Sequence, residues 1–333
     1  MSAGPLDTAL TRHAGITVPI VCGAMYPCGN PELVAAVSEA GGIGIVQPVT
    51  LTYVSGHPFR AGLRYIRSLT TKPIGMNALI EKTSRRHHER MMRWVDEALE
   101  EGVRFFVTSL GDPREVVSRA HAAGGIVYHD ATEARWAARA RDAGVDGLVA
   151  VNARAGGHAG PRGAEALFEE LRPFGLPVVC AGGVGDAPDF VAALALGCAG
   201  VQMGTRFIAT PECRASEAYK QALVAAGEAD IVLTERISGI PIAVLNTPYV
   251  RRVGLRAGAL SRWLLRHPRT KYAMRGFYAL RAMGRLKRAS ADSSGSLDHW
   301  QAGRSVAGIH AIEPAGDIVR RFAAAAVREL GGN

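Results

Sequence analysis

The stretch AGVDGLVAVNARAGGHAG, residues 143–160, decides the fold. It opens on an Ala-Gly pair typical of a helix end, because glycine accepts the left-handed conformation found there. The apolar run over 146–151 indicates a buried strand, and the glycine loop after it leaves His158 among side chains too small to shield it. A titratable side chain on a flexible loop at a strand's carboxyl end is how α/β barrels present catalytic groups. The stretch therefore predicts one βα unit of a barrel and indicates an enzyme.

The same order of helix end, glycine and apolar run recurs between residues 18 and 205. Eight such runs alternate with alanine-rich amphipathic segments, which is the rhythm of βα units in a parallel sheet. Because eight units close on themselves, the sequence predicts an α/β fold of the TIM (β/α)8 barrel type. The predicted strands cover residues 18–22, 43–46, 73–77, 103–107, 125–128, 146–151, 177–180 and 199–203. The clearest intervening helices are predicted over 31–40, 86–100, 132–143 and 187–196.

The chain divides where this rhythm stops. Its 333 residues, 48% of them hydrophobic, are enough for a barrel of about 250 residues and an extension. We predict the barrel core over residues 1–235 and a mainly helical, basic C-terminal extension over 236–333 that packs on it. After residue 205, where the rhythm stops, the expected order is a helix over 217–226, an irregular stretch with Gly239, Pro241 and Pro248, a polar linker over 290–296 and a terminal helix over 317–330.

The basic segment, residues 251–288, contains twelve Lys or Arg and no Asp or Glu, whereas the whole chain has a formal net charge of +9. The rest of the chain is therefore close to neutral. The segment also carries aromatic and leucine side chains, so it can cover the barrel with an apolar face and expose its arginines. Weak contact with an anionic membrane surface or an acidic partner is one alternative, and a role in oligomer contacts or substrate gating is another.

The composition also excludes several classes of protein. No stretch reaches the roughly 18 to 20 uninterrupted apolar residues of a membrane span, and the first residues lack the apolar segment of a secretory signal. We therefore expect a cytoplasmic protein. The five cysteines are scattered without metal-ligand spacing, so we expect reduced thiols and no metal site; they are Cys22, Cys28, Cys180, Cys198 and Cys213.

Two glycine loops follow the last two predicted strands, AGGVG over 181–185 and QMGT over 202–205. In barrels the loops after strands 7 and 8 commonly bind phosphate, because glycine lets backbone N–H groups approach the anion and a helix N-terminus adds a favourable dipole. The pair therefore predicts a ligand that carries a phosphate. The alternative is that these glycines serve tight βα turns only.

Asn77 and Met25 are expected at the same end of the barrel, after the third and the first predicted strands. An amide both donates and accepts hydrogen bonds, which suits a heterocycle with alternating N–H and C=O edges. The alternatives are a turn-forming role for Asn77 and a core-filling role for Met25. Their position favours the heterocycle.

Taken together, these motifs make the chain resemble the FMN-dependent nitronate monooxygenases, formerly called 2-nitropropane dioxygenases, over about residues 15–235. The resemblance is carried by AGGHAG over 155–160, AGGV over 181–184, QMGTRF over 202–207 and TPE over 210–212. It implies a TIM barrel that holds FMN noncovalently. The flavin-binding positions that it implies are Ala24, Met25, Asn77, Gly156, Gly157, Ala181, Gly182, Gly183, Gln202, Met203, Gly204 and Thr205.

The resemblance also implies that His158 is the catalytic histidine. Placed near the flavin, it takes a proton from the α-carbon of a nitroalkane or stabilises a bound nitronate, and oxidation by FMN with O2 then gives a carbonyl compound and nitrite. An unperturbed imidazole pKa of about 6.5 leaves such a base mostly neutral at pH 7. The implied partners are a nitronate or nitroalkane and O2, with no nucleic acid, and a homo-oligomer is left open.

The chain departs from the family pattern at several positions. Val151 stands where the family usually carries Gln, and Arg154 stands where it usually carries Glu. Two hypotheses follow, that Asn152 substitutes as a flavin ligand and that Arg154 brings positive charge toward the flavin. Tyr128, His129 and Asp130 also fit the family pattern poorly, and we expect a strand end there with Asp130 as the cap of the next helix.

Two other functions stay open at this point. The same framework resembles flavin-dependent enoyl-acyl-carrier-protein reductases and NADH:quinone reductases, so an NAD(P)H-dependent flavin reductase is the first alternative. A flavin-binding or membrane-associated protein without turnover is the second, and it is favoured by Val151 and the basic segment.

Overall fold

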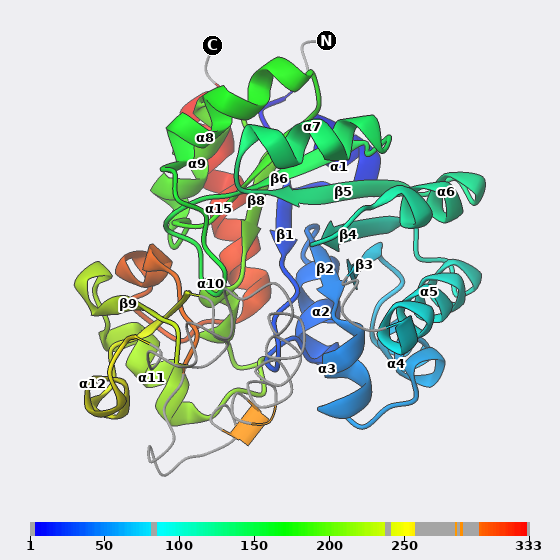
Figure 1. Cartoon of the computed structure of the whole chain (residues 1–333). Coiled ribbons are helices and arrows are strands. Elements are labelled where there is room, and N and C mark those ends of the chain that lie inside the picture. Colours follow the sequence, from blue (N-terminus) through cyan, green and yellow to red (C-terminus); the bar gives the residue numbers. More distant parts are fainter. Residues whose placement is uncertain are drawn as a thin grey trace.

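Eight parallel strands form a closed barrel surrounded by helices (Figure 1). The computed structural model describes residues 4–80, 85–236, 241–256, 284, 287–288 and 300–331. Each predicted strand overlaps an observed one, so the prediction of a TIM (β/α)8 barrel is confirmed. The strands are β1 (Ile20–Cys22), β2 (Ile43–Val46), β3 (Ile74–Leu79), β4 (Phe105–Ser109), β5 (Ile126–Ala131), β6 (Gly147–Val151), β7 (Val178–Ala181) and β8 (Gly200–Met203).

Side chains of these strands alternate between the barrel interior and the surrounding helices, because the side-chain period of a strand is two. Inward-facing residues pair around the barrel, for example Val107 with Tyr128 and Val149 with Val179. All four belong to one buried apolar cluster inside the barrel, which also contains Leu10 of helix α1 (Ala9–Ala14). The same alternation decides which side chains face the interior at the carboxyl ends of the strands.

The outer helices begin and end with the signals that the sequence indicates. Gly144 follows α7 with a φ of +84°, in the left-handed region that ends a helix. Asp186 caps α9, and its side chain accepts a hydrogen bond of 2.9 Å from the backbone N–H of Asp189. The helices are α2 (Pro31–Glu39), α3 (Pro48–Tyr53), α4 (Phe59–Leu69), α5 (Arg85–Glu100), α6 (Arg114–Ala122), α7 (Ala134–Asp142), α8 (Ala164–Leu171), the 3-10 helix η1 (Arg172–Phe174), α9 (Ala187–Ala195) and α10 (Thr205–Ile208).

After α10 the described chain adds several further elements before its last helix. Figure 1 shows β9, α11 and α12 gathered on one side of the barrel. The segment that we expected to be irregular contains a strand, because β10 pairs antiparallel with β9. The elements are α11 (Glu217–Ala225), the 3-10 helix η2 (Glu228–Asp230), β9 (Ile231–Thr234), β10 (Ile242–Leu245), α12 (Pro248–Val253), the 3-10 helix η3 (Arg304–Gly308) and α15 (Ala315–Leu330). Residues 257–283, 285–286 and 289–299, which include most of the basic segment and the predicted linker, lie outside the described residues.

The last helix, α15, packs against α9 and α2. Its Phe322 is fully buried and stacks on Phe190 of α9, with ring centroids 5.8 Å apart. Because α9 precedes β8 and α2 follows β1, α15 covers the seam where the last strand meets the first. The predicted terminal helix over 317–330 is therefore present, and it occupies the position of the eighth helix of the barrel.

Candidate active site

The carboxyl ends of the eight strands meet at one end of the barrel, which we call the mouth. Each strand brings one inward-facing position there, two residues beyond an inward-facing residue of the interior. On the side of β2 to β5 these positions are polar, whereas on the side of β6 and β7 they are apolar. In strand order from β1 to β8 they are Gly23, Gln47, Asn77, Ser109, Asp130, Val151, Ala181 and Gln202.

The polar positions form a continuous hydrogen-bonded chain, which we call the polar arc: Gln47, Asn77, Ser109 and Asp130. Gln47 donates through Nε2 to Asn77 Oδ1 at 3.1 Å. Asn77 Nδ2 donates to Ser109 Oγ and to the carbonyl of Val107, both at 3.1 Å. Ser109 in turn donates to Asp130 Oδ2 at 2.6 Å. Because each member orients the next, the arc presents a preset polar surface to a ligand at the mouth.

Asp130 has one carboxyl oxygen that the protein does not use. Its Oδ1 is buried and has no hydrogen-bond partner among the described residues. Burial raises the pKa of Asp130 to about 6, against the opposing effect of the Ser109 hydrogen bond. The expectation of a helix-capping aspartate is wrong, because Asp130 lies inside β5 and the N-cap of α7 is Glu133.

His129 points the other way from the same strand and lies away from the mouth. Its Nδ1 is 2.8 Å from Thr108 Oγ1, and that hydroxyl donates its own proton to the carbonyl of Tyr128 at 3.1 Å. The histidine therefore donates from Nδ1 and carries its proton there. Burial lowers the pKa of His129 to about 4, so the ring is neutral at pH 7.

On the other side of the mouth lies the glycine arc: Gly156 and Gly157 after β6, Gly182 and Gly183 after β7, and Gly204 after β8. Gly182 has a φ of +113°, and a Cβ placed on it would lie 2.5 Å from the backbone nitrogen of Ala155. A side chain at this position would therefore push the loops after β6 and β7 apart. Only glycine allows the two loops to approach this closely.

The loops after β1 and β8 also meet. A Cβ on Gly204 would lie 3.3 Å from Met25 Sδ, and a Cβ on Gly23 would lie 2.9 Å from Gln202 Cγ. Ala24 packs on the interior cluster below them. Of the predicted flavin-binding positions, the structure thus brings Ala24, Met25 and Gln202–Gly204 into one group beside the β1–β8 seam.

Asn152 braces the glycine arc rather than facing a ligand. Its side chain is fully buried, and its Nδ2 donates to the carbonyl of Gly182 at 2.8 Å. Its Oδ1 accepts from the backbone N–H of Arg154, also at 2.8 Å. The hypothesis that Asn152 replaces the missing Gln as a flavin ligand is therefore wrong, since backbone groups hold both ends of its amide.

Arg154 lies beside the loop after β7. A Cβ on Gly183 would be 3.1 Å from Arg154 Cδ, and the guanidinium forms an ion pair with Glu228. Its Nε is buried without a hydrogen-bond partner in the part of the chain that the structure describes. The positive charge of Arg154 thus stands next to the predicted phosphate loop, rather than over the polar arc.

The segment that follows the basic region reaches into the glycine arc. The backbone N–H of Gly303 donates to Thr205 Oγ1 at 2.9 Å, and the N–H of Arg304 donates to the carbonyl of Arg154 at 2.9 Å. The N–H of Ala243, on β10, donates to the carbonyl of Gly157 at 2.8 Å. The loop that carries His158 is therefore held from outside by residues that are remote in sequence, while His158 itself is exposed.

The predicted site residues include every glycine of the glycine arc but miss most of the polar arc. Only Asn77 of the arc was among the predicted site residues. The signal for the others was available in the inward parity of the strands, but the predicted fourth and fifth strands ended at residues 107 and 128, whereas β4 and β5 reach Ser109 and Ala131. The missed residues are Gln47, Ser109 and Asp130.

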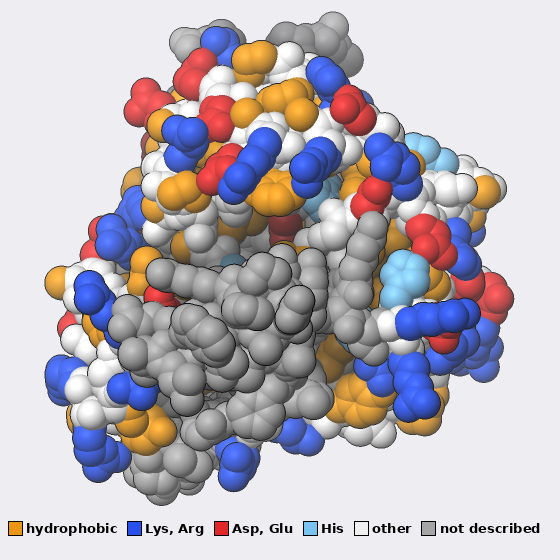
Figure 2. All heavy atoms as spheres, viewed as in Figure 1, with side chains coloured by type: hydrophobic (Ala, Val, Ile, Leu, Met, Phe, Trp, Pro, Cys, Tyr) orange, Lys and Arg blue, Asp and Glu red, His pale blue; other side chains and the backbone are white. Residues whose placement is uncertain are grey.

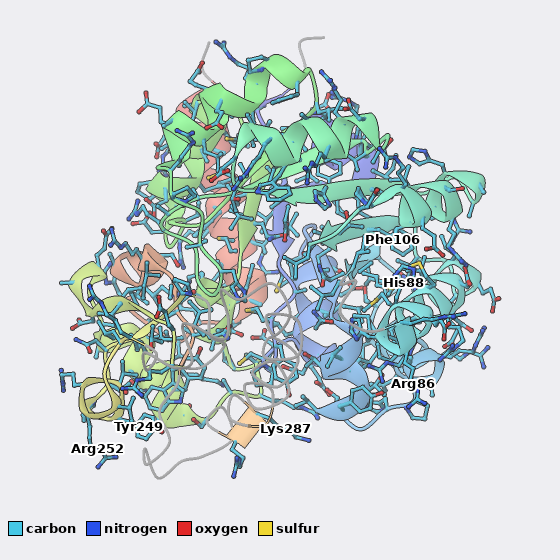
Figure 3. All side chains as sticks on the ribbon, viewed as in Figure 1. Arg86, His88, Phe106, Tyr249, Arg252 and Lys287 are labelled. Atoms are coloured by element: carbon cyan, nitrogen blue, oxygen red, sulfur yellow. The ribbon has the colours of Figure 1, made fainter. Side chains whose placement is uncertain are left out.

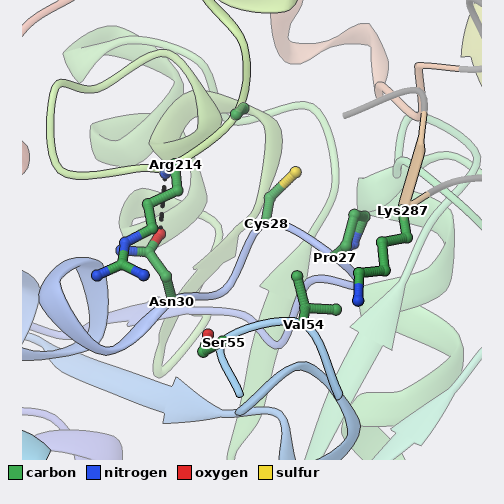
Figure 4. Close-up of a pocket in the computed structure, with 8 residues that line it drawn as sticks. Pro27, Cys28, Asn30, Val54, Ser55, Arg214 and Lys287 are labelled. Atoms are coloured by element: carbon green, nitrogen blue, oxygen red, sulfur yellow. Dashed lines mark hydrogen bonds between the residues drawn. The ribbon is translucent and has the colours of Figure 1, made fainter. Parts of the chain in front are cut away.

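A cavity of about 170 Å³ lies beside the mouth, between the loop after β1 and the end of α3 (Figure 4). Cys28 and Val54 line its apolar part. Two cations border it: Lys287 donates to the carbonyl of Tyr53 at 2.7 Å, and Arg214 forms an ion pair with Glu32. The cavity is therefore a candidate place for part of a substrate.

Basic residues on the described surface are mixed with acidic ones. Figure 2 shows Lys and Arg side chains beside Asp and Glu on this face. Figure 3 places Tyr249 and Arg252 of α12 on the opposite side of the molecule from Arg86 of α5. Arg252 lies over the Tyr249 ring, 5.5 Å from its centroid. This described part of the basic segment therefore makes a contact within its own helix.

The described residues also bear on metals, thiols and membranes. All five cysteines are buried free thiols, as predicted. No group of three or more His, Cys, Asp or Glu converges on a possible metal position in the described part of the chain. None of the described helices combines the length and the apolar composition that a membrane span requires.

A closed parallel barrel with convergent polar groups and glycine loops at its carboxyl end defines a barrel enzyme that binds a ligand at the mouth. The sequence pattern of the nitronate monooxygenase family matches residues 7–322, and the chain belongs to that family. It is therefore a flavin-dependent oxidoreductase.

Relatives of this chain differ in their reactions. The (3aS,4S,5R,7aS)-5-hydroxy-7a-methyl-1-oxo-octahydro-1H-indene-4-carboxyl-CoA dehydrogenase of Rhodococcus jostii is 33% identical over 246 residues, 74% of this chain and 67% of that protein. The nitronate monooxygenase of Pseudomonas aeruginosa is 34% identical over 272 residues, 69% of this chain and 77% of that protein. The solved structure of FabK from Thermotoga maritima matches with a TM-score of 0.79 at 27% identity, over 98% of this chain and 97% of that one.

Proposed function

We propose that the protein holds FMN across the mouth and oxidises an alkyl nitronate, or the parent nitroalkane, to a carbonyl compound and nitrite with O2. The observation that carries the proposal is the opposition of the two arcs around one mouth. A planar heterocycle with donors and acceptors on its edges suits the polar arc, and a phosphate suits closely packed glycine loops.

Two buried polar atoms test whether the mouth fits this cofactor. Asp130 Oδ1 is buried without a partner among the described residues, and so is Arg154 Nε, beside Gly183. A ligand with a polar ring and an anionic tail would satisfy both atoms, and buried polar groups are normally satisfied. The residues present therefore fit FMN, with Gly182, Gly183 and Gly204 toward the phosphate.

The chain's own contribution to the reaction comes from His158. With a nitroalkane as substrate, the neutral imidazole removes the proton from the α-carbon. With a preformed nitronate, the imidazolium pairs with the substrate oxygens and no proton needs to be removed. The chemistry that the flavin supplies when bound is oxidation of the resulting carbanion, with O2 as the final acceptor.

The test is nitrite release from a nitronate in air without a pyridine nucleotide. We expect purified protein to be yellow, and we expect His158→Ala to lower turnover by about 100-fold or more while FMN stays bound. Gln221→Ala, an exposed change on α11, is the matched control and should leave turnover unchanged. A His158→Ala protein with full turnover would contradict the assigned role and would favour a flavin-binding protein without catalysis.

A second candidate function is a dehydrogenase or reductase reaction on a substrate that carries an anionic group such as CoA. The Rhodococcus jostii relative favours it, and so do the cations Arg214 and Lys287 beside the cavity. Rapid anaerobic bleaching of the flavin by NADH or NADPH, or by a hydroxyacyl-CoA, with no nitrite release from nitronates, would replace the first proposal by this one.

A further inference from the structure

Asp130 occupies a position where an acid is unusual, on the inward side of β5 at the mouth. It lies one residue before the end of β5 and two residues after Tyr128, which is fully buried in the interior cluster. By strand alternation its side chain faces inward, beside Ser109 of β4. The carboxyl group therefore lies at the inner surface on which a ligand would rest.

The directions of the hydrogen bonds decide which oxygen carries the proton when Asp130 is neutral. Both donors of an amide lie on its nitrogen, so Asn77 Nδ2 donates to Ser109 Oγ. The hydroxyl then has its own proton free, and it donates that proton to Asp130 Oδ2. Because Oδ2 acts as an acceptor, the proton of a neutral Asp130 belongs on Oδ1.

The remaining oxygen of Asp130, Oδ1, receives no hydrogen bond from the described protein. It is buried and has no hydrogen-bond partner in the described residues. A buried carboxylate with one unsatisfied oxygen is costly, whereas a neutral carboxyl group needs only one acceptor to be satisfied. The raised pKa of Asp130, about 6, agrees with a group that its surroundings keep near neutrality.

Among the described residues, no cation contributes to the pKa of Asp130, which is set by burial and by the Ser109 hydrogen bond. The strands beside β5 are β4 and β6, and their inward neighbours Val107 and Val149 are apolar. β5 carries two other titratable groups. His129 faces outward against Thr108, and Tyr128 lies in the interior cluster with its hydroxyl 3.1 Å from His13 Nδ1. The helices α6 and α7 pack on the outer side of the strand. A flat ring placed on the mouth would remove further water and favour the neutral acid still more.

We propose that Asp130 is a neutral acid that contacts the bound flavin and donates a hydrogen bond from Oδ1 to an acceptor atom of the isoalloxazine ring. Ser109, with Asn77 and Gln47 behind it, is the positioning chain that leaves Oδ1 as the donor. A donor at this place favours the reduced flavin, which is richer in electrons, over the oxidised one. The inference rests on the proposed function, because it needs FMN at the mouth.

Four variants separate the neutral donor from other roles. Asp130→Asn keeps a neutral donor and an acceptor for Ser109, while Asp130→Ala removes both. Ser109→Ala removes the positioning hydroxyl. Thr108→Val is the matched control, because Thr108 is a fully buried hydroxyl on the neighbouring position of the same strand but faces outward to His129. Circular dichroism and the melting temperature show that each variant is folded.

The measurements are the dissociation constant of FMN and the midpoint potential of the bound flavin at pH 7, neither of which depends on turnover. We expect Asp130→Ala to weaken FMN binding about tenfold, as for one lost hydrogen bond with a buried partner. A further tenfold loss of preference for the reduced flavin would lower the potential by about 30 mV. We expect Asp130→Asn and Thr108→Val to stay within about threefold of the wild type, and Ser109→Ala to fall between.

Two results would overturn the inference alone: FMN bound by Asp130→Ala with wild-type affinity and potential, or Asp130→Asn as strongly changed as Asp130→Ala. The second would mean that the ionised carboxylate acts on the flavin. Wild-type protein that binds no FMN would instead overturn the proposed function, and this inference with it.

Discussion

The two sides of the mouth are built on different principles. The polar arc consists of side chains at the carboxyl ends of barrel strands, and each member is held by the next one. The glycine arc consists of loop backbone, and it is held from outside by β10 and by the segment around Gly303. The comparison gives a role to the described elements between β8 and α15. The strands support the polar arc by themselves, whereas the loops need an external brace.

The largest expected effect comes from adding a side chain to the glycine arc. Gly182→Ala places a Cβ 2.5 Å from the backbone nitrogen of Ala155, at a φ of +113°. Left-handed strain and overpacking against backbone together cost about 4 kcal/mol, so we expect FMN binding to fall by at least about 100-fold or the melting temperature to drop sharply.

The matched control for that change is Gly163→Ala. Gly163 is exposed at the N-cap of α8 and has no atom within 4 Å of a placed Cβ. It should leave both FMN content and melting temperature close to those of the wild type. Equal effects of the two substitutions would show that the close approach of the loops is not needed.

A somewhat smaller effect is expected from cutting the anchor of the external brace. Arg206 of α10 is fully buried, forms an ion pair with Glu313 and donates to the carbonyl of Ala311 at 3.1 Å. Arg206→Ala removes this buried partner, and we expect a loss of about 3 kcal/mol in the free energy of unfolding, measured by urea denaturation. The exposed Arg321 pairs with the same carboxylate, so Arg321→Ala should cost less than about 1 kcal/mol. Similar losses in both variants would mean that burial does not distinguish the two arginines.

The smallest expected effect is on the pH dependence of stability. It compares Asp130 on the inward face of β5 with His129 on the outward face. The pKa of Asp130 is raised to about 6, so its contribution to stability is present below pH 4 and is lost as the pH rises to 6. The pKa of His129 is lowered to about 4, so its contribution is present above pH 6.5 and is lost as the pH falls to 4. Between about pH 4 and 6 the two slopes therefore oppose each other.

Removing the titration of Asp130 should leave only the effect of His129 on the pH dependence of the free energy of unfolding. Asp130→Asn is expected to be about 2 kcal/mol more stable than the wild type at pH 7, and its free energy of unfolding should rise more steeply between pH 4 and 6. Urea denaturation across that range measures this difference. Asp142→Asn, an exposed change on α7, should keep the wild-type profile. An Asp130→Asn protein with the wild-type profile would show that Asp130 is not perturbed in the fold.

Much of the candidate site followed from local patterns. The apolar runs predict all eight strands, and the loops after them predict where Gly182, Gly204 and His158 emerge. Most of the polar arc could not be predicted, because in the sequence Ser109 and Asp130 resemble the first residues of loops. They belong to strands only because β4 and β5 continue to pair beyond their apolar runs. The role of Asn152 was likewise misjudged, since its partner Gly182 comes from the next βα unit.

By itself the sequence determined the barrel, the order of its units and the loops at its carboxyl end, because these depend on hydrophobic period and on helix-ending glycines within a few residues. Only the tertiary structure decided that Gly303 would hold Thr205 across 98 residues, that β10 would pair over the His158 loop, and that α15 would close the seam. It also decided that one oxygen of Asp130 would be buried without a partner among the described residues. Such contacts join positions far apart in the chain, and no local pattern encodes them.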